Sequence, residues 1–297
     1  MHIGMVGLGR MGGNMRDRVR AAGHEVTGFD VDPDISEVAS IADLVAALPA
    51  GERVVWVMVP AGAPTLGVLT ELAELLTEGD LVIEGGNSHY KDDQRNAAML
   101  AERGVGYLDA GISGGIWGRT YGYGIMVGGR EQDVARAMPI FDALRPEGPA
   151  EEGFVHAGSV GAGHYSKMVH NGIEYGLMQA YAEGYEIIAS RSDLIPDVTA
   201  VMRAWQRGTV VRSWLLELLV DALEDDPGLT SVADYANDSG EGRWTLEEAI
   251  DNAIPAPTLS AALFARFVSR QEESPAMKAI AALREEFGGH ATRQAGE

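Results

Sequence analysis

The residues best suited to chemistry gather in one stretch, GHYSKMVHNGIEYGLMQAYAEG, at positions 163–184. The stretch is typical of a helix, and it carries Lys167, His170, Asn171 and Glu174 at offsets of zero, three, four and seven. Residues at these offsets share one helix face. A buried helix usually places apolar residues at that spacing. An amine, an imidazole, an amide and a carboxylate in a row therefore indicate a functional face.

Lys167 and Glu174 are suited to proton transfer. A lysine can act as a general base when burial or a nearby cation lowers its pKa. A glutamate can act as an acid when its pKa is raised. The alternative is a solvated lysine, the commoner state of this residue. The shared face favours the functional interpretation, as do the glycines of GSVGAGH at the helix entrance, which allow a ligand to approach closely.

The elements that position this helix follow from the first half of the chain. Short apolar strands, from HIGMVG to GFVHAG, alternate with helical stretches, and this pattern indicates βαβ units and a largely parallel sheet. After about Gly161 the strand signals stop. We expect an α/β fold with a Rossmann-type doubly wound domain at residues 1–160 and an all-α substrate and dimerisation domain at residues 161–297 with a polar C-terminal tail. The expected helices include 35–48, 66–76, 90–103 and 131–144, then, beyond the central helix, 197–206, 210–223, 246–252, 259–271 and 276–287.

Composition limits the class of protein. The 297 residues carry a net charge of −21 and contain no cysteine. The charge argues against a nucleic acid or anionic membrane as partner. The absence of cysteine excludes disulfides and cysteine-bound metals and fits a cytoplasmic location. We identify no secretory signal, no membrane-spanning segment and no metal motif.

The glycine motif GLGRMG, Gly7 to Gly12, directly follows a strand and opens a helix. In a dinucleotide-binding turn, the first glycine forms the turn, the second allows the pyrophosphate to approach and the third allows helix and strand to pack. The helix N-terminus offers free N–H groups to the phosphates. The alternative is a plain strand–glycine–helix turn.

Asp30 ends the second strand, where an acidic residue binds the ribose hydroxyls of NAD. The segment FDVDP offers Asp30 and Asp32 but no Arg or Lys, so we favour NAD over NADP. The alternative is that Asp30 only caps the turn before Pro33.

Together these motifs resemble the 6-phosphogluconate dehydrogenase family, in a short bacterial form, over nearly the whole chain. The segments that carry the resemblance are GLGRMGGNM, EGGNSHY, GISGG, GAGHYSKMVHNGIEY, LFAR and REEFGGH. The resemblance implies oxidative decarboxylation of 6-phosphogluconate to ribulose 5-phosphate, with Lys167 as base and later acid, and Glu174 as acid.

The resemblance also implies the binding residues. Substrate contacts are expected from Asn87, Ser113, Gly114, Gly115, His170, Asn171, Tyr175 and Arg266, and from Arg284 and His290 of a neighbouring subunit's tail. Cofactor contacts are expected from Gly7, Leu8, Gly9, Met11, Gly12, Asp30, Val59 and Asn87. The partner is thus a phosphorylated sugar acid, and the assembly a homodimer or a dimer of dimers. Arg284 and His290 could instead form a solvated helix end.

Two departures from the family pattern affect the substrate and the cofactor. The family's KGTGKWT reads SGEGRWT here, so Ser239 replaces a phosphate-binding lysine. Phosphate binding is then expected to depend on Arg266, Arg284 and Tyr175. The NADP-type members carry NRT where this chain has DVD, with Val31 in place of the arginine, which again favours NAD.

Two other functions remain open. One is another β-hydroxyacid dehydrogenase, of the 3-hydroxyisobutyrate or tartronate semialdehyde type, which would not need His170, Glu174 or Tyr175 in this pattern. The other is a non-catalytic NAD-binding scaffold, which would tolerate loss of Lys167 or Asn171.

Overall fold

The structure is a computed structural model that describes residues 1–293; residues 294–297, the end of the expected tail, lie outside the described part. The chain divides into two compact units, Met1–Gly172 and Ile173–Glu297. The division falls inside the long helix α7 (Ala162–Ala189), which begins in the first unit.

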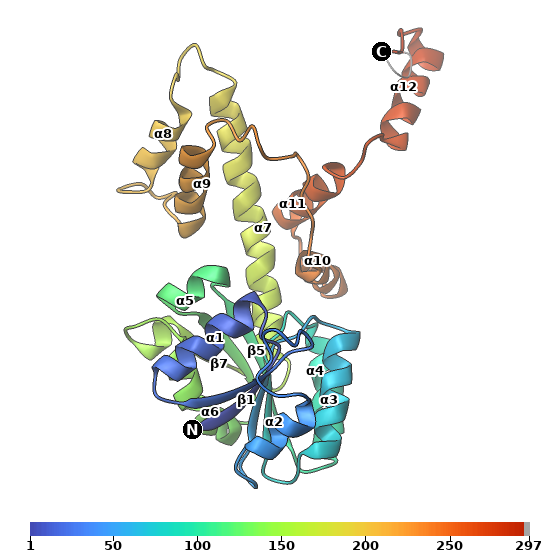
Figure 1. The fold of residues 1–297 in the computed structure, drawn as a ribbon. Helices are drawn as coiled ribbons and strands as arrows, with labels where there is room; N and C mark the ends of the chain where they lie inside the picture. The colour runs from blue at the N-terminus through green and yellow to red at the C-terminus, as the bar shows by residue number, and fades with distance from the viewer. Residues whose placement is uncertain (294–297) are drawn as a thin grey trace. The chain divides into compact units, whose positions relative to one another are not determined.

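The first unit is built on a seven-stranded sheet with the order β2-β1-β3-β4-β5-β6-β7 (Figure 1). Its strands are β1 (His2–Val6), β2 (Glu25–Phe29), β3 (Val54–Val57), β4 (Leu81–Glu84), β5 (Gly106–Ser113), β6 (Gly124–Gly129) and β7 (Phe154–Gly158). Its helices are α1 (Arg10–Ala21), α2 (Ile41–Ala47), α3 (Ala63–Leu75), α4 (Tyr90–Ala101), α5 (Gly118–Tyr121) and α6 (Glu131–Leu144), with short 3₁₀ turns at η1 (Gly115–Trp117) and η2 (Ala150–Glu152). This arrangement confirms the expected doubly wound α/β fold.

Helices cover both faces of the sheet because its central strands are apolar on both sides. Along β3, Trp56 packs into the core formed with α1 and α6, whereas its neighbours Val55 and Val57 pack into the core formed with α2, α3 and α4. Successive side chains of a strand point to opposite faces, so this four-residue strand contributes to both cores.

Strand β6 runs antiparallel to β5, whereas the other strand pairs are parallel. The connection between β5 and β6 contains only η1 and the four-residue helix α5. A parallel neighbour needs a crossover of a dozen or more residues, and this connection is too short for one.

The helix expected at 35–48 is shorter in the structure. Helix α2 begins at Ile41 because the Ser40 side chain caps it, accepting a hydrogen bond from the backbone N–H of Asp43. The residues before Ser40 form turns, in which the side chain of Asp32 accepts from the backbone N–H of Asp34. Asp and Ser favour such local bonds over helix interiors.

The second unit is helical in its described part. After α7 it contains α8 (Val198–Trp205), α9 (Trp214–Asp225), α10 (Glu241–Asp251), α11 (Pro257–Val268) and α12 (Pro275–Gly288). Met202 of α8 packs with Leu216, Val220 and Leu223 of α9 in one small core. Tyr175 of α7 packs with α11 in another. This confirms the expected helical C-terminal part.

Helix α12 differs from the other helices of this unit, because none of its residues is buried. Met277, Ile280, Leu283 and Phe287 are all exposed, Phe287 by 94%. They recur at the three- and four-residue spacing of one helix face, so α12 presents an apolar stripe to solvent.

Among the described residues, no helix combines the length and the apolar character needed to cross a bilayer.

Candidate active site

The glycine loop between β1 and α1 has the geometry of a dinucleotide-binding turn. Gly7 has a φ of +94°, and a side chain there would also clash with the carbonyl oxygen of Met58. A Cβ on Gly9 would meet nothing within 4 Å, whereas one on Gly12 would clash with the carbonyl of Gly7. The turn is therefore tight at its first glycine, open at its second and closely packed at its third, which fits the approach of a pyrophosphate.

Asp30 follows β2 and is bonded to the glycine loop. Its Oδ2 accepts a hydrogen bond from the backbone N–H of Leu8 at 2.6 Å, and its Oδ1 accepts from that of Asp32 at 3.0 Å. The carboxylate thus caps the turn before Pro33, which is the structural role considered above as the alternative to ribose binding. Each carboxylate oxygen can accept a further bond, so the turn role leaves acceptor capacity for a ribose hydroxyl. Val31 beside it is 91% exposed.

The other expected cofactor contacts lie at the same edge of the sheet. A Cβ on Gly7 would be 3.1 Å from Cγ1 of Val59, and a Cβ on Gly86 would be 2.9 Å from the carbonyl oxygen of Val59. Asn87 follows Gly86 and is exposed, whereas Ser88 after it is buried. These residues follow the carboxyl ends of β1, β3 and β4, where ligands bind in doubly wound sheets. Met11, in the first turn of α1, packs against the core on that helix's face of the sheet.

Lys167 is held close to the sheet. It is 8% exposed, and it lies on the first turns of α7 over β5. A Cβ on Gly111 of β5 would be 2.5 Å from Cβ of Lys167 and 2.7 Å from the carbonyl oxygen of Gly163. Only glycine at position 111 allows α7 to lie this close to the strand.

Ser113, His170 and Asn171 form a hydrogen-bonded row in the first unit. Ser113 Oγ at the end of β5 lies 3.4 Å from Nε2 of His170, and Nδ1 of His170 lies 3.1 Å from Oδ1 of Asn171. Asn171 is 8% exposed, one turn of α7 after Lys167. Gly114 and Gly115 continue from Ser113 with φ of +135° and +52°, a region that favours glycine. The structure therefore brings together the residues expected from GISGG and from the start of α7.

In the second unit, Tyr175, Arg266 and Ser239 lie together. The guanidinium of Arg266 stacks over the Tyr175 ring, with its central carbon 3.5 Å from the ring centroid. The Tyr175 hydroxyl accepts a hydrogen bond from the backbone N–H of Ser239 at 3.2 Å. The hydroxyl of Ser239 donates to Oε2 of the buried Glu241 at 2.5 Å. An arginine held against a phenol is suited to a phosphate group, because its guanidinium supplies both charge and N–H donors.

Glu174 lies on α7 at the start of the second unit and is half-buried. Arg284 and His290 belong to α12 and the residues just after it, and both are exposed. The helix ends at Gly289, whose φ of +62° is left-handed, and the backbone N–H of Gly289 donates to the carbonyl of Glu285. Within the described chain these two residues therefore lie on an exposed helix end, and their part in a neighbouring site stays a prediction.

The sequence did not reveal the residue that anchors the start of α7. Asp109 of β5 is fully buried, and its two carboxylate oxygens accept hydrogen bonds from the backbone N–H groups of Gly161 at 2.6 Å and of His164 at 2.9 Å. A carboxylate at a helix N-terminus satisfies its unpaired N–H groups and its dipole. Asp109 lies more than 50 residues before α7, so no local pattern pointed to it.

Comparison with known proteins places this geometry in a family. A family model described as the NAD binding domain of 6-phosphogluconate dehydrogenase matches residues 2–146, and one described as the 6-phosphogluconate dehydrogenase C-terminal domain matches residues 163–295. An NAD(+)-dependent, decarboxylating 6-phosphogluconate dehydrogenase of Haloferax volcanii is 41% identical, over 98% of this chain and 98% of that protein.

Solved structures agree on the fold. The 6-phosphogluconate dehydrogenase of Plasmodium falciparum, studied with NADP+ and with 6-phosphogluconate, is 26% identical with a TM-score of 0.79; the similarity covers 100% of this chain and 67% of that one. A 3-hydroxyisobutyrate dehydrogenase of Mycobacterium tuberculosis is 22% identical with a TM-score of 0.71, over 95% of this chain and 99% of that one. The second similarity extends to the fold alone.

Proposed function

Because the chain belongs to the 6-phosphogluconate dehydrogenase family, we propose that it oxidises and decarboxylates 6-phosphogluconate to ribulose 5-phosphate with NAD as the preferred cofactor. The observation that carries this proposal is the buried Lys167, one turn from the buried Asn171 and on the same helix as Glu174. The first two residues are common to β-hydroxyacid dehydrogenases. Glu174 is the residue that a decarboxylating reaction adds.

Lys167 begins the reaction as a base. Its amine accepts the proton of the C3 hydroxyl while C3 gives up a hydride, and burial is the setting in which a lysine can act unprotonated. NAD, when bound at the glycine loop, supplies the acceptor for that hydride. His170 and Asn171 hold the substrate hydroxyls, and Ser113 orients His170 through their contact of 3.4 Å.

The oxidised product is a β-keto acid, and Lys167 now carries a proton. Its ammonium donates a hydrogen bond to the new ketone oxygen and draws electron density toward it. The bond to the carboxyl carbon then breaks and carbon dioxide leaves. The electron pair of that bond forms an enediol as the ketone oxygen takes the proton of Lys167. Glu174, seven residues along α7 and on the same face, donates a proton to the carbon that becomes C1 of ribulose 5-phosphate, while the neutral Lys167 takes the proton of the neighbouring enol oxygen, which becomes the ketone of the product.

Tyr175 and Arg266, with Arg284 from the tail of a neighbouring subunit, are proposed to bind the phosphate. Arg266 supplies the positive charge, and its stacking on Tyr175 fixes the plane of its N–H donors. Ser239 supplies no positive charge in place of the family's lysine, and its one hydroxyl proton is donated to Glu241. Phosphate binding should therefore depend more on Arg266 here than in family members that also have the lysine.

NAD preference is supported by the residues after β2. Asp30 carries a negative charge toward the position of an adenosine ribose, and the exposed Val31 offers no cation to a 2′-phosphate. A carboxylate repels the 2′-phosphate of NADP and accepts hydrogen bonds from the ribose hydroxyls of NAD.

The assay uses purified protein with NAD or NADP, and compares 6-phosphogluconate with gluconate and 3-hydroxyisobutyrate. We expect NAD reduction with 6-phosphogluconate, and at least tenfold lower kcat/KM with each phosphate-free acid. Faster turnover of 3-hydroxyisobutyrate would instead assign the chain to the plain β-hydroxyacid dehydrogenases. NAD binding without turnover of any of these acids would favour the scaffold.

We also propose that two copies of the chain complete each other's site. The support is the exposed apolar stripe of α12 together with two exposed residues, Arg284 in the last turns of the helix and His290 just after it. A helix with such a stripe is stabilised by packing on another surface, and a second copy supplies one.

Mixing two inactive variants tests this assembly. Lys167→Met removes the base, and Arg284→Met removes the tail contact. If the tail serves the neighbouring site, hybrid dimers contain one site with an intact Lys167 and an intact neighbouring Arg284. Activity should then recover on mixing after dissociation and reassociation. No recovery, in dimers shown by mass to be hybrids, would place Arg284 in its own subunit's site. Full activity of Arg284→Met by itself would place Arg284 outside any site.

A further inference from the structure

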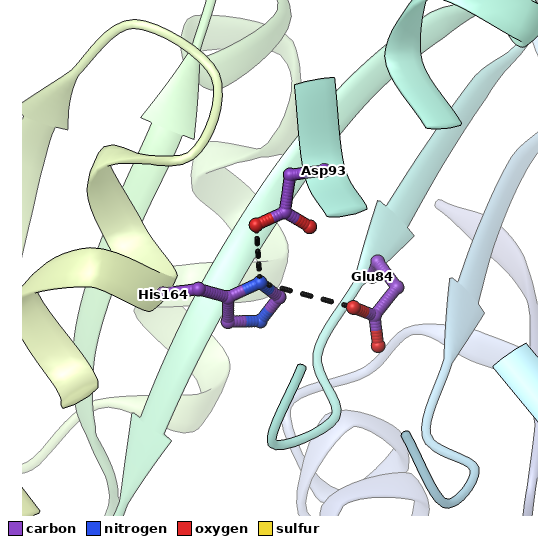
Figure 2. Close-up of side chains that lie close together, drawn as sticks. All are labelled: Glu84, Asp93 and His164. Atoms are coloured by element: carbon purple, nitrogen blue, oxygen red, sulfur yellow. Dashed lines mark hydrogen bonds and ion pairs between the residues drawn. The ribbon is translucent and has the colours of Figure 1, made fainter. Parts of the chain in front are cut away.

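A buried ionic cluster of Glu84, Asp93 and His164 lies beneath the start of α7 (Figure 2). The carboxylates of Glu84 and Asp93 are fully buried, and the imidazole of His164 is 1% exposed. Nδ1 of His164 lies 2.8 Å from Oδ2 of Asp93 and 3.8 Å from Oε2 of Glu84. The proposed reaction, as described, uses none of these three side chains.

The two carboxylates lie on either side of Asn87 in the sequence. Glu84 ends β4, and its Oε1 accepts a hydrogen bond from the backbone N–H of Gly86 at 2.8 Å. Asp93 lies in the first turn of α4. The imidazole of His164 therefore contacts both ends of the turn that presents Asn87.

On the other side, His164 lies three residues before Lys167 in the first turn of α7. Its backbone N–H donates to Asp109, and a Cβ on Gly163 would lie 2.6 Å from the carbonyl oxygen of Asp109. The helix start is thus fixed on β5 by its backbone and on β4 and α4 by the His164 ring.

The charges of the cluster favour a protonated imidazole. Burial lowers the pKa of His164, but the carboxylates of Asp93, Glu84 and Asp109 together raise it to about 10. Burial raises the pKa of Asp93 to about 6, against the opposing effect of His164. The hydroxyl of Tyr107 donates to the other oxygen of Asp93 at 2.8 Å. Near neutral pH the cluster therefore holds an ionic hydrogen bond, whose two charges must stay together because each is costly to bury alone.

A metal ion is the other group that these three side chains could hold. Two ligand atoms on a tetrahedral zinc, each about 2.0–2.1 Å from the ion, lie roughly 3.3 Å apart. The 2.8 Å separation of His164 Nδ1 and Asp93 Oδ2 is shorter and has the length of a charge-assisted N–H···O bond. The geometry thus favours a shared proton.

We propose that Glu84, His164 and Asp93 are positioning residues that fix the Asn87 turn against the helix carrying Lys167. This inference rests on the proposed function, because it assigns Asn87 and Lys167 to one reaction. Reacting groups must be held to within about 1 Å, and an error of that size can cost roughly 100-fold in rate. A cluster that touches no substrate can therefore control kcat.

The test compares Asp93→Asn and Glu84→Gln with the control Tyr107→Phe. Asp93→Asn removes the charge that faces His164 but keeps the side-chain shape. Glu84→Gln keeps an acceptor for Gly86 and is the second variant if the first does not fold. Tyr107→Phe removes a bond to the same Asp93 but leaves the contact with His164.

For each folded variant, kcat with 6-phosphogluconate is measured together with the Kd of NAD and the melting temperature. We expect kcat to fall about 10- to 100-fold in Asp93→Asn and Glu84→Gln. Asn87 is also an expected cofactor contact, so the Kd of NAD should rise by no more than the loss of one hydrogen bond allows, about fivefold. Tyr107→Phe should keep both kcat and this Kd within about twofold. A purely structural role would lower the melting temperature without lowering kcat per folded molecule.

Three results would overturn the proposal or its premise. Wild-type kcat in the folded Asp93→Asn and Glu84→Gln proteins would remove the positioning role. One equivalent of metal in the purified protein, with activity lost on chelation, would assign the cluster to an ion. A wild-type protein that does not turn over 6-phosphogluconate would refute the proposed function, and this inference would fall with it.

Discussion

The close approach of α7 to β5 makes Gly111→Ala an informative change. The added Cβ would be 2.5 Å from Cβ of Lys167 and 2.7 Å from the carbonyl oxygen of Gly163. Carbon atoms normally approach to about 3.5–4.0 Å, so strand and helix must separate by about 1 Å. The backbone of Gly111 is not in the left-handed region, so the lack of space is the only obstacle.

A shift of about 1 Å in Lys167 should lower the rate of hydride transfer about 100-fold, which corresponds to about 2.7 kcal/mol in the barrier. The same overpacking should cost about 1–3 kcal/mol of stability. Gly111 lies on β5, which is separated in the sheet from β1 and its glycine loop by β3 and β4, so the Kd of NAD should remain within twofold.

The assay is single-turnover reduction of NAD by 6-phosphogluconate in a stopped-flow instrument, with NAD binding measured separately. The control is Gly124→Ala on the paired strand β6, where the nearest atom to the new Cβ is Cβ of Ser113 at 3.9 Å, an ordinary contact. Equal rates for folded Gly111→Ala and wild type would show that the spacing between α7 and β5 does not control the reaction of Lys167. A matching loss of NAD binding would show that the effect is not local to Lys167.

Four further changes have expected outcomes. Lys167→Ala should reduce kcat by at least 1,000-fold while NAD binding, followed by fluorescence, changes little; lost NAD binding would mean that Lys167 is structural. Asp30→Ala should weaken NAD more than NADP in steady-state assays, and equal weakening would show that Asp30 does not bind the ribose. Arg266→Met should raise KM for 6-phosphogluconate about 10- to 100-fold with a smaller change for gluconate, because a charge-assisted contact to phosphate contributes about 1.5–3 kcal/mol; equal changes would exclude a phosphate contact. The pKa of His164 is raised to about 10 in the fold, above its ordinary value of 6.5, so its contribution to stability is complete below pH 6.5 and is lost as pH rises toward 10. The free energy of unfolding is measured in urea at pH 7 and 9.5, and this group should lower it by at most about 1.4 kcal/mol per pH unit. The fall should be smaller in His164→Gln. An equal fall in wild type and variant would show that His164 is not charged in the fold.

The parts of the fold that depend on local patterns could be predicted from the sequence. The alternation of apolar strands and helices predicted the doubly wound unit, and GLGRMG after a strand predicted the turn at Gly7. The match of both family models confirms the resemblance drawn from the motifs. The start of α2 was wrong because Asp and Ser side chains bond locally in the preceding turns, and the helical pattern did not reveal this.

The buried cluster could not be predicted for a different reason. Asp93 and His164 are 71 residues apart, and Asp109 and His164 are 55 apart. Asp is usually exposed and His is intermediate, so the residue types alone did not predict burial. Their shared burial arises only when β4, β5, α4 and α7 pack together.

Lys167 and Glu174 are proposed to carry out oxidation followed by decarboxylation on one substrate. The most direct measurement is the ratio of carbon dioxide released to NAD reduced, with carboxyl-labelled 6-phosphogluconate as substrate. We expect one carbon dioxide per NADH and ribulose 5-phosphate as the sugar product. NADH formation with the label retained in a keto acid would contradict this expectation and would make the protein a plain hydroxyacid dehydrogenase.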